Sequence, residues 1–387
     1  MKILFPNISF YPAQIGGPNN TLLWHTKFLT KNNINPIIIT TTYSIGSQFI
    51  IKKNTWLDKD FGRIIYLKEP FGFIPLKLIA TGIRHFFKSD IIHFNSIFTS
   101  ATVYLIFIAV LFRRKVILSP RGELFYAAIS RKTKKKKIVL LAYRIIKNKV
   151  LFHATSSEES ETIHKYFKTP RIVIQSNFIW PDYKEKPGNI NKNFVFLGRI
   201  NRIKNIDTFI RGLLQSKRFV ESSSRFIIAG FYRFENEKEY YDELRTMVAD
   251  HALEDKIDFI GYIEGKEKEE LLKNAFFLIL PSKTENFGNV VVEALSCHTP
   301  VIASKGTPWE ILEKYNAGYW VEGSPDGFSK SIDKALSLSE VDYIDMTNNA
   351  IRLVQEKYDV NSPENKWTTI YRNEVSKKWK NRKIKHF

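Results

Sequence analysis

Two glutamates flank a glycine in the segment Glu285-Asn286-Phe287-Gly288-Asn289-Val290-Val291-Val292-Glu293. We expect a helix to begin near Gly288, and the N–H groups and dipole of a helix start suit a phosphate. Carboxylates on either side of such a phosphate can accept hydrogen bonds from hydroxyls of a sugar and a ribose. Acidic residues at a helix start also favour its dipole without any ligand. The glutamate pair, the glycine and the neighbouring predicted strands together favour a binding site.

Two cationic residues follow another predicted strand. Arg199 comes directly after Gly198, and Lys204 precedes Asn205 in the next turn. A guanidinium and an ammonium group can stabilise the negative charge of a departing diphosphate. A solvated basic turn explains this string equally well. Gly16-Gly17-Pro18, after the first predicted strand, would let the backbone approach a ligand closely, although an ordinary turn explains it too.

These residues need a scaffold, and the hydrophobic pattern predicts one. The predicted strands are Lys2–Ile8, Pro36–Thr41, Ile64–Leu67, Ile91–Phe94, Val116–Ser119, Leu151–Ala154, Ile172–Gln175, Phe194–Leu197, Phe226–Ala229, Ile257–Phe259, Phe276–Leu280, Val301–Ala303 and Tyr319–Val321. Amphipathic segments such as Thr21–Thr30, Ile97–Phe112, Lys134–Lys147 and Glu158–Phe167 lie between them. Apolar strands separated by helices are typical of parallel sheets covered on both faces. We therefore predict an α/β protein of two doubly wound, Rossmann-like domains, with ligands bound just beyond the strand ends.

Charge divides the chain in two. Residues 1–180 hold 27 Lys/Arg and 8 Asp/Glu, a net of +19, whereas residues 181–387 hold 32 and 31, a net of +1. We predict an N-terminal domain over 1–180, a second domain over 181–362 and a linker at Trp180–Asn193. The asymmetry indicates different partners for the two domains.

Several classes of protein find little support. A single cysteine, Cys297, excludes an internal disulfide framework, and no Walker-type loop supports a kinase or ATPase. Asp58 and Asp60 have the spacing of a metal-binding pair but lack a third ligand, so we predict no metal site. The longest apolar run, Ala101 to Phe112, is shorter than the ~20 residues that span a bilayer, and the first residues lack signal-peptide features. We expect a cytoplasmic protein, or one attached to a membrane without crossing it.

The chain resembles the group 1 glycosyltransferases, glycosyltransferase family 4, over nearly its whole length. The matching features are Gly16-Gly17, the strand that ends near His93, Ser119-Pro120-Arg121-Gly122, Gly198-Arg199, Lys204-Asn205, the two glutamates eight residues apart, Ala294-Leu295 and Thr299-Pro300-Val301-Ile302-Ala303. The string Gly306-Thr307-Pro308-Trp309-Glu310 also resembles a subset that builds bacterial surface polysaccharides. The resemblance implies the GT-B fold, with two domains facing across a cleft and the last helix, within residues 363–387, returning to the first domain.

The resemblance also implies residue roles. Arg199 and Lys204 would contact the donor diphosphate, Glu285 the donor sugar and Glu293 the donor ribose. The remaining donor contacts would come from Gly17 in the first domain, from Phe287, Gly288 and Asn289 at the helix start, and from Tyr262 near the nucleobase. Many family members have a histidine two residues after the one matched by His93, and this chain has Asn95 there. His93, Asn95 and Arg121 are thus candidates for the acceptor side, although His93 also fits a buried structural histidine.

The predicted activity is a retaining sugar transfer, without a required metal or cofactor, from a UDP- or GDP-sugar to a saccharide. Attack from the leaving-group face is the better hypothesis, because no enzymic nucleophile for a double displacement is evident. The acceptor would be a saccharide, or one linked to polyprenyl diphosphate, in capsule, exopolysaccharide or O-antigen synthesis. A GT-B nucleotide-sugar epimerase is one alternative. A basic nucleic-acid-binding protein is another, but no recognisable module supports it, and we predict no nucleic-acid partner.

A basic segment suggests contact with an anionic membrane at the cytoplasmic face. Arg131 to Lys137 carries six basic residues, and the mostly apolar segment Ile138 to Lys147 follows it. On a helix, Ile138, Leu141, Ala142 and Ile145 share one face. A helix buried on all sides with a solvated lysine cap is the competing interpretation.

Overall fold

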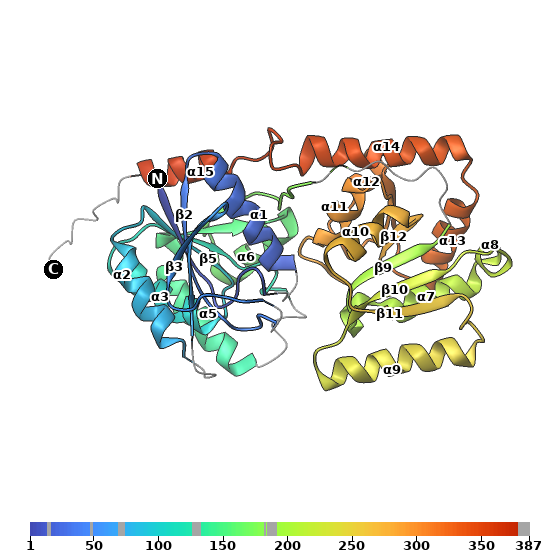
Figure 1. Ribbon diagram of the computed structural model, residues 1–387, viewed down its shortest axis with the longest axis horizontal. Coiled ribbons are helices and arrows are strands. Elements are labelled where there is room, and N and C mark those ends of the chain that lie inside the picture. Colours follow the sequence, from blue (N-terminus) through green and yellow to red (C-terminus); the bar gives the residue numbers. More distant parts are fainter. Residues whose placement is uncertain are drawn as a thin grey trace. The chain divides into compact units, whose positions relative to one another are not determined.

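The computed structural model describes residues 1–13, 17–46, 49–68, 74–125, 133–181, 183 and 192–377. The chain forms two compact units. Unit 1 comprises Met1–Ser176 together with the segment from Asn365 onward, and unit 2 comprises Asn177–Glu364 (Figure 1). Most of the predicted linker Trp180–Asn193 lies outside the described residues.

Unit 1 contains one sheet with the strand order β3-β4-β2-β1-β5-β6-β7-β8 in its described part. Its strands are β1 (Lys2–Pro6), β2 (Asn35–Thr41), β3 (Trp56–Lys59), β4 (Gly62–Leu67), β5 (Ile91–Asn95), β6 (Val116–Ser119), β7 (Val150–Ala154) and β8 (Arg171–Ile174). Its helices are α1 (Gly17–Lys31), α2 (Leu76–Phe86), α3 (Ser100–Leu111), α5 (Thr133–Ile146), α6 (Ser157–Phe167) and α15 (Trp367–Ser376). The central strands are apolar and fully buried, as Ile3 to Phe5 of β1 illustrate, and this burial on both faces explains their continuous hydrophobic runs.

The edge strand β3 departs from the predicted pattern. It pairs antiparallel with β4, so the sheet is not wholly parallel. Its last two residues, Asp58 and Lys59, are exposed. This strand is not among the predicted ones, because a short exposed edge strand has no buried face to impose hydrophobic alternation. Asp58 and Asp60 instead face cations, Arg63 at 4.0 Å and Lys27 at 3.0 Å.

The C-terminal helix α15 belongs to unit 1 although 190 or more residues separate it from the rest of that unit. Its Tyr371 hydroxyl lies 2.9 Å from Nε2 of His25 in α1. The ring of Trp367 packs against the same histidine, with centroids 4.5 Å apart. Figure 1 shows α15 (red) beside α1 (dark blue). Residues 378–387, at the end of the expected helix, lie outside the described residues.

Unit 2 contains a parallel sheet with the described order β11-β10-β9-β12-β13-β14. Its strands are β9 (Phe194–Arg199), β10 (Phe226–Phe231), β11 (Ile257–Gly261), β12 (Phe277–Leu280), β13 (Val301–Ser304) and β14 (Gly318–Val321). Its helices are α7 (Ile206–Gln215), α8 (Lys217–Glu221), α9 (Glu235–Asp250), α10 (Gly265–Asn274), α11 (Asn289–Ser296), α12 (Ile311–Lys314), α13 (Pro325–Leu336) and α14 (Glu340–Lys357). The order reverses between β9 and β12, and such a switch point is where open α/β sheets bind ligands.

None of the helices in the described ranges is long and apolar enough to cross a membrane.

Candidate active site

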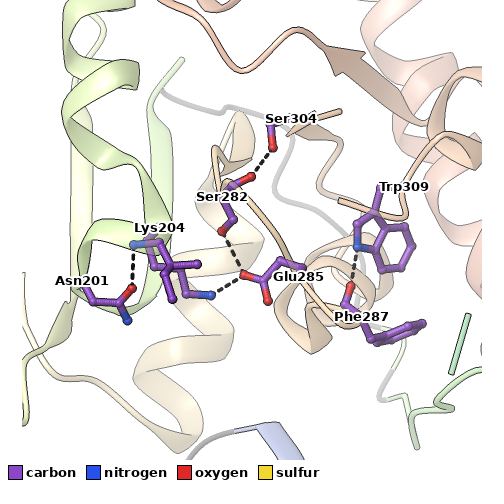
Figure 2. Close-up of polar contacts among 8 residues, drawn as sticks. Asn201, Lys204, Ser282, Glu285, Phe287, Ser304 and Trp309 are labelled. Carbon is purple, nitrogen blue, oxygen red and sulfur yellow. Dashed lines mark hydrogen bonds and ion pairs between the residues drawn. The ribbon is translucent and has the colours of Figure 1, made fainter. Parts of the chain in front are cut away.

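The turn after β9 fixes Lys204. Asn201 begins a short 3₁₀ turn, Arg202–Lys204, by accepting a hydrogen bond from the Ile203 backbone N–H at 3.0 Å. The Lys204 N–H donates to the Asn201 carbonyl at 2.9 Å (Figure 2). The Lys283 N–H, from the loop after β12, donates to the Ile203 carbonyl at 2.8 Å. The two loops at the switch point are therefore joined through their backbones.

Glu285 lies in the loop after β12 and meets Lys204. Its Oε1 accepts a hydrogen bond from Ser282 Oγ at 2.9 Å and forms an ion pair with the Lys204 ammonium group (Figure 2). Ser304 Oγ, at the end of β13, donates to the Ser282 carbonyl at 2.5 Å. Lys204 and Glu285 keep 21% and 15% of their side chains exposed. The structure thus brings together a cation and a carboxylate that we predicted from separate strings, and leaves both within reach of solvent.

Gly288 caps the N-terminus of α11 in a left-handed conformation, with φ of +80°. A side chain is strained in that conformation, which explains the glycine. The preceding carbonyl, of Phe287, accepts a hydrogen bond at 2.5 Å from Nε1 of the fully buried Trp309 (Figure 2). Asn289 Oδ1 accepts another from Asn177 Nδ2 at 3.2 Å. These contacts hold the start of α11, where backbone N–H groups can meet an anion.

The other predicted donor residues of unit 2 also have charged or polar partners. Glu293, inside α11, forms an ion pair with Lys268 of α10 at 2.7 Å. Tyr262 follows β11, is 49% exposed, and donates to Glu264 Oε2 at 2.7 Å. Partial burial is the larger cause, and the hydrogen bond to Glu264 the smaller cause, of a raised pKa of the Tyr262 hydroxyl. Its exposed ring suits stacking against a flat group.

Arg199, the last residue of β9, faces a carboxylate that sequence reasoning missed. Its Nε lies 3.4 Å from Oε1 of Glu237, in the first turn of α9. Lys268 was missed in the same way. Neither partner has a spacing relation to the predicted motifs, so no sequence signal could have found them. Three pairs of opposite charge thus occupy this part of unit 2: Arg199–Glu237, Lys204–Glu285 and Lys268–Glu293.

The candidates in unit 1 are more deeply enclosed. His93, in β5, is 1% exposed, and both ring nitrogens are engaged: Nδ1 with the Tyr371 hydroxyl at 2.6 Å and Nε2 with Ser119 Oγ at 2.7 Å. Asn95, which ends β5, accepts from Arg121 Nη2 at 2.9 Å. Burial lowers the pKa of Arg121 to about 10. His93 therefore has the environment of a structural histidine, whereas Asn95 and Arg121 form a polar pair after neighbouring strands.

One of the two glycines in the predicted Gly16-Gly17 pair lies within the described residues. Gly17 is the first residue of α1. Gly16 lies outside the described residues.

Comparison with known proteins matches residues 182–352 to the model of the group 1 glycosyl transferases. This region contains the three charge pairs and the start of α11. This region of the chain is therefore similar to the group 1 glycosyl transferases.

Two glycosyltransferases are similar to part of the sequence. An uncharacterized glycosyltransferase of Methanocaldococcus jannaschii, MJ1607, is 29% identical over 184 residues, covering 47% of this chain and 45% of that protein. The O-antigen chain mannosyltransferase RfbU of Salmonella typhimurium is 31% identical over 150 residues, covering 39% and 37%. The matches thus span less than half of these relatives' length.

The whole chain resembles solved structures of the same architecture. Anabaena Alr3699/HepE in complex with UDP and glucose superposes with a TM-score of 0.74 at 19% identity, covering 96% of this chain and 99% of that one. Sucrose-phosphate synthase from Thermosynechococcus elongatus gives the same score at 18% identity, covering 96% and 98%. The predicted GT-B fold of two Rossmann-like units is confirmed.

Proposed function

We propose that this protein transfers a sugar, with retention of anomeric configuration, from a nucleotide-sugar donor to a saccharide acceptor. The observation that carries the proposal is the meeting of Lys204, Glu285 and the N-terminus of α11 at the switch point of unit 2. A cation and a helix start suit a diphosphate, and the adjacent carboxylate suits sugar hydroxyls. The family match over residues 182–352 supports the same assignment.

In the proposed reaction, the bond between the anomeric carbon and the diphosphate oxygen breaks while Arg199, Lys204 and the α11 N–H groups stabilise the charge on the leaving group. The acceptor oxygen forms the new bond on the same face of the sugar. The acceptor proton passes to a leaving phosphate oxygen. Glu285 binds donor hydroxyls, Glu293 binds the ribose, and no metal takes part.

The proposed donor is a UDP- or GDP-sugar, and the proposed pathway is bacterial surface-polysaccharide synthesis on a lipid-linked saccharide. The UDP complex of the Anabaena structure supports a nucleotide donor, and the partial match to the O-antigen mannosyltransferase supports the pathway. Asn95 and Arg121 are proposed acceptor-side contacts, because they follow adjacent strands of unit 1. His93 is left out, since both of its ring nitrogens are engaged.

The experiment begins with donor binding. The purified protein is heated with a panel of UDP- and GDP-sugars, and a donor that binds the folded state raises the midpoint of unfolding. Glu293→Gln should reduce this shift, whereas Glu254→Gln, at an exposed turn of unit 2, should leave it unchanged. Absence of a shift with every donor would contradict the proposal. Turnover of the donor without any added acceptor, giving an isomeric nucleotide sugar, would favour the epimerase instead.

We further propose that α5 docks unit 1 on an anionic membrane surface at the cytoplasmic face. Ile138, Leu141 and Ile145 form an apolar stripe along this helix and are 69%, 63% and 82% exposed. Leu140 and Tyr143 point into the core of unit 1. The helix is therefore not buried on all sides. An apolar stripe beside basic residues is typical of helices that lie in a membrane interface.

The basic residues stand in the first turns of the same helix. Lys134, Lys135 and Lys137 are exposed, while Lys136 lies 5.0 Å above the ring of Phe98. Each cation near an anionic leaflet contributes ~1 kcal/mol. Arg131 and Lys132, also part of the predicted basic segment, lie outside the described residues.

Vesicle co-sedimentation across a salt series tests the docking. Binding should require anionic lipid, weaken with salt, and decrease when Lys134 to Lys137 become Gln or when Ile138, Leu141 and Ile145 become Ser. A matched control changes four exposed lysines of unit 2 to Gln: Lys217, Lys266, Lys314 and Lys330. Equal binding to neutral and anionic vesicles would contradict docking. Tight binding of random duplex DNA without any lipid effect would favour a nucleic-acid partner.

A further inference from the structure

Glu237 is an ionisable side chain with no exposed surface, and the proposed reaction does not yet use it. It occupies the first turn of α9, just beyond the end of β10. A carboxylate in such a place loses its hydration, and hydrogen bonds or a nearby cation must compensate. The question is therefore which groups compensate for its burial.

The two carboxylate oxygens of Glu237 have different surroundings. Oε2 accepts a hydrogen bond from the Arg233 backbone N–H at 2.9 Å. Oε1 has no hydrogen-bond partner in the part of the chain that the structure describes, and Arg199 Nε lies 3.4 Å from it. One oxygen thus anchors the start of α9, while the other faces the guanidinium at the end of β9.

The contact between Arg199 and Glu237 is made through Nε of the guanidinium group. Arg199 is 40% exposed, and no hydrogen bond to its terminal Nη groups is found among the described residues. An arginine that is held through Nε still has its two Nη groups to donate in parallel to phosphate oxygens. Strand pairing fixes the backbone as well, because Arg199 pairs with Phe231 in β10.

We infer that Glu237 is a positioning residue that holds Arg199 through Nε so that the Nη edge meets the donor diphosphate. This inference rests on the proposed function, in which Arg199 contacts that diphosphate. A long side chain that is already oriented loses less conformational freedom when the ligand binds, so its hydrogen bonds contribute more to affinity. Glu237 acts through Arg199 and does not contact the nucleotide.

A merely structural role for Glu237 is the competing account, since Oε2 accepts a hydrogen bond at the start of α9. Glu237→Gln separates the two roles. Its amide oxygen can still accept from the Arg233 N–H, but the negative charge that faces Arg199 is gone. Glu237→Asp keeps the charge and withdraws it by one methylene, so its effect should be intermediate. Glu235→Gln, on an exposed residue of the same turn, is the matched control.

The test is a double-mutant cycle on nucleotide binding. UDP and GDP are titrated calorimetrically into the wild type, Glu237→Gln, Arg199→Gln and the double variant. For the diphosphate that the wild type binds, each single variant should weaken binding about tenfold, as expected when a charge-assisted contact is lost. In the double variant, the second substitution should weaken binding by less than a further factor of about two, because Glu237 acts on the nucleotide only through Arg199.

The outcomes separate the inference from the function on which it rests. Equal losses from Glu237→Gln in the presence and absence of Arg199 overturn the positioning role, as does a loss confined to Arg199→Gln. If the wild type binds neither diphosphate, the proposed function fails and the inference with it. If Glu237→Gln does not fold, Arg199→Lys carries the test, since lysine has no Nε edge for Glu237 to hold. A lysine variant that binds as tightly as the wild type overturns the inference.

Discussion

Polar side chains occur toward the carboxyl ends of the strands in both units, but their environments differ. In unit 1, His93 of β5, Ser119 of β6 and His153 of β7 are at most 1% exposed and are linked by hydrogen bonds. In unit 2, Lys204 and Glu285 remain partly exposed and carry opposite charges. Burial favours neutral groups that satisfy one another, whereas partial exposure lets groups stay ionised. We infer that His93, Ser119 and His153 stabilise the architecture of unit 1, whereas Lys204 and Glu285 have the partly exposed, charged environment that a ligand-binding pair requires.

The hydrogen bonds of unit 1 have one consistent proton arrangement. The Gln175 carbonyl can only accept, so His153 Nε2, at 2.8 Å, must donate to it. The neutral His153 then accepts at Nδ1 from Ser119, whose oxygen accepts from His93 Nε2. His93 Nδ1 in turn accepts from the Tyr371 hydroxyl. This series of hydrogen bonds links β5, β6 and β7 to α15, and every group in it is neutral.

The pKa values of the histidines agree with that arrangement. Burial lowers the pKa of His153 to about 3 and holds the pKa of His25 and of His93 well below the ordinary value. Neighbouring positive groups, including Arg121 for all three, act in the same direction. All three imidazoles are therefore neutral near pH 7, as their hydrogen bonds require.

The comparison predicts its largest effect at Glu285. Glu285→Gln keeps the shape and removes the charge that should strengthen sugar contacts as the ring becomes oxocarbenium-like. The transfer rate should fall ~100-fold or more, with only a modest change in donor affinity. Initial rates and donor titrations measure both quantities. Glu293→Gln should instead mainly weaken donor binding, and near-normal turnover of Glu285→Gln would remove Glu285 from the site.

A smaller effect, on stability rather than turnover, is expected at Tyr371. Tyr371→Phe removes the hydroxyl between His25 and His93, which leaves buried imidazole nitrogens without partners. The cost should be about 1–3 kcal/mol in the free energy of unfolding, measured by urea titration. Tyr315→Phe is the control, because its hydroxyl donates to Glu356 at the surface of unit 2 and should matter little. Equal effects of the two changes would argue against a special role for the buried chain.

The same histidines predict a pH dependence confined to unit 1. Their pKa values are lower in the folded state than the unfolded value of 6.5, so below about pH 6.5 the unfolded chain binds more protons. Stability should therefore be complete above that pH and decrease as the pH falls, by up to about 1.4 kcal/mol per pH unit for each histidine.

Urea titrations between pH 7.5 and 5 can be resolved by unit with pulse hydrogen exchange at one fixed labelling pH. Peptides from β5 should lose protection at lower urea as the pH falls, and peptides from β12 should change less. If peptides from β12 lost more protection than peptides from β5, the pH sensitivity would lie in unit 2 and the prediction would be contradicted.

Hydrophobic patterning predicted most of this architecture, because buried parallel strands must be apolar. The strand Val116–Ser119 has the predicted bounds, and other strands differ by a few residues at their ends. The edge strand β3 was missed because its exposed residues carry no such pattern. Strands that are buried can be predicted from their apolar residues, whereas an exposed edge strand has no such pattern and cannot.

Contacts between residues far apart in the sequence limit how much of the candidate site can be predicted from the sequence. The sequence predicted Lys204 and Glu285 after two separate strands. That these strands are neighbours, and that the two side chains pair across 81 positions, depends on the fold. Glu237 and Lys268 come from helices in which most other acidic and basic residues are exposed. His93 and Tyr371 are 278 positions apart, so the sequence could offer a structural histidine at β5 only as one interpretation. Residue type and local spacing predicted the candidate donor-site residues, but not the residues with which they pair.

The smallest expected effect is that of chelation. Arg199, Lys204 and the N-terminus of α11 can supply the positive charge that a divalent ion would otherwise contribute to a departing diphosphate. Transfer should therefore continue at a nearly unchanged rate in saturating EDTA, measured with a donor identified by the thermal panel. The Arg199→Gln variant sharpens the test, because adding Mg²⁺ should not restore its lost rate if the protein cations act alone. Complete loss in EDTA, reversed by a divalent ion, would contradict metal independence and would mean that the charge pairs of unit 2 do not neutralise the leaving group by themselves.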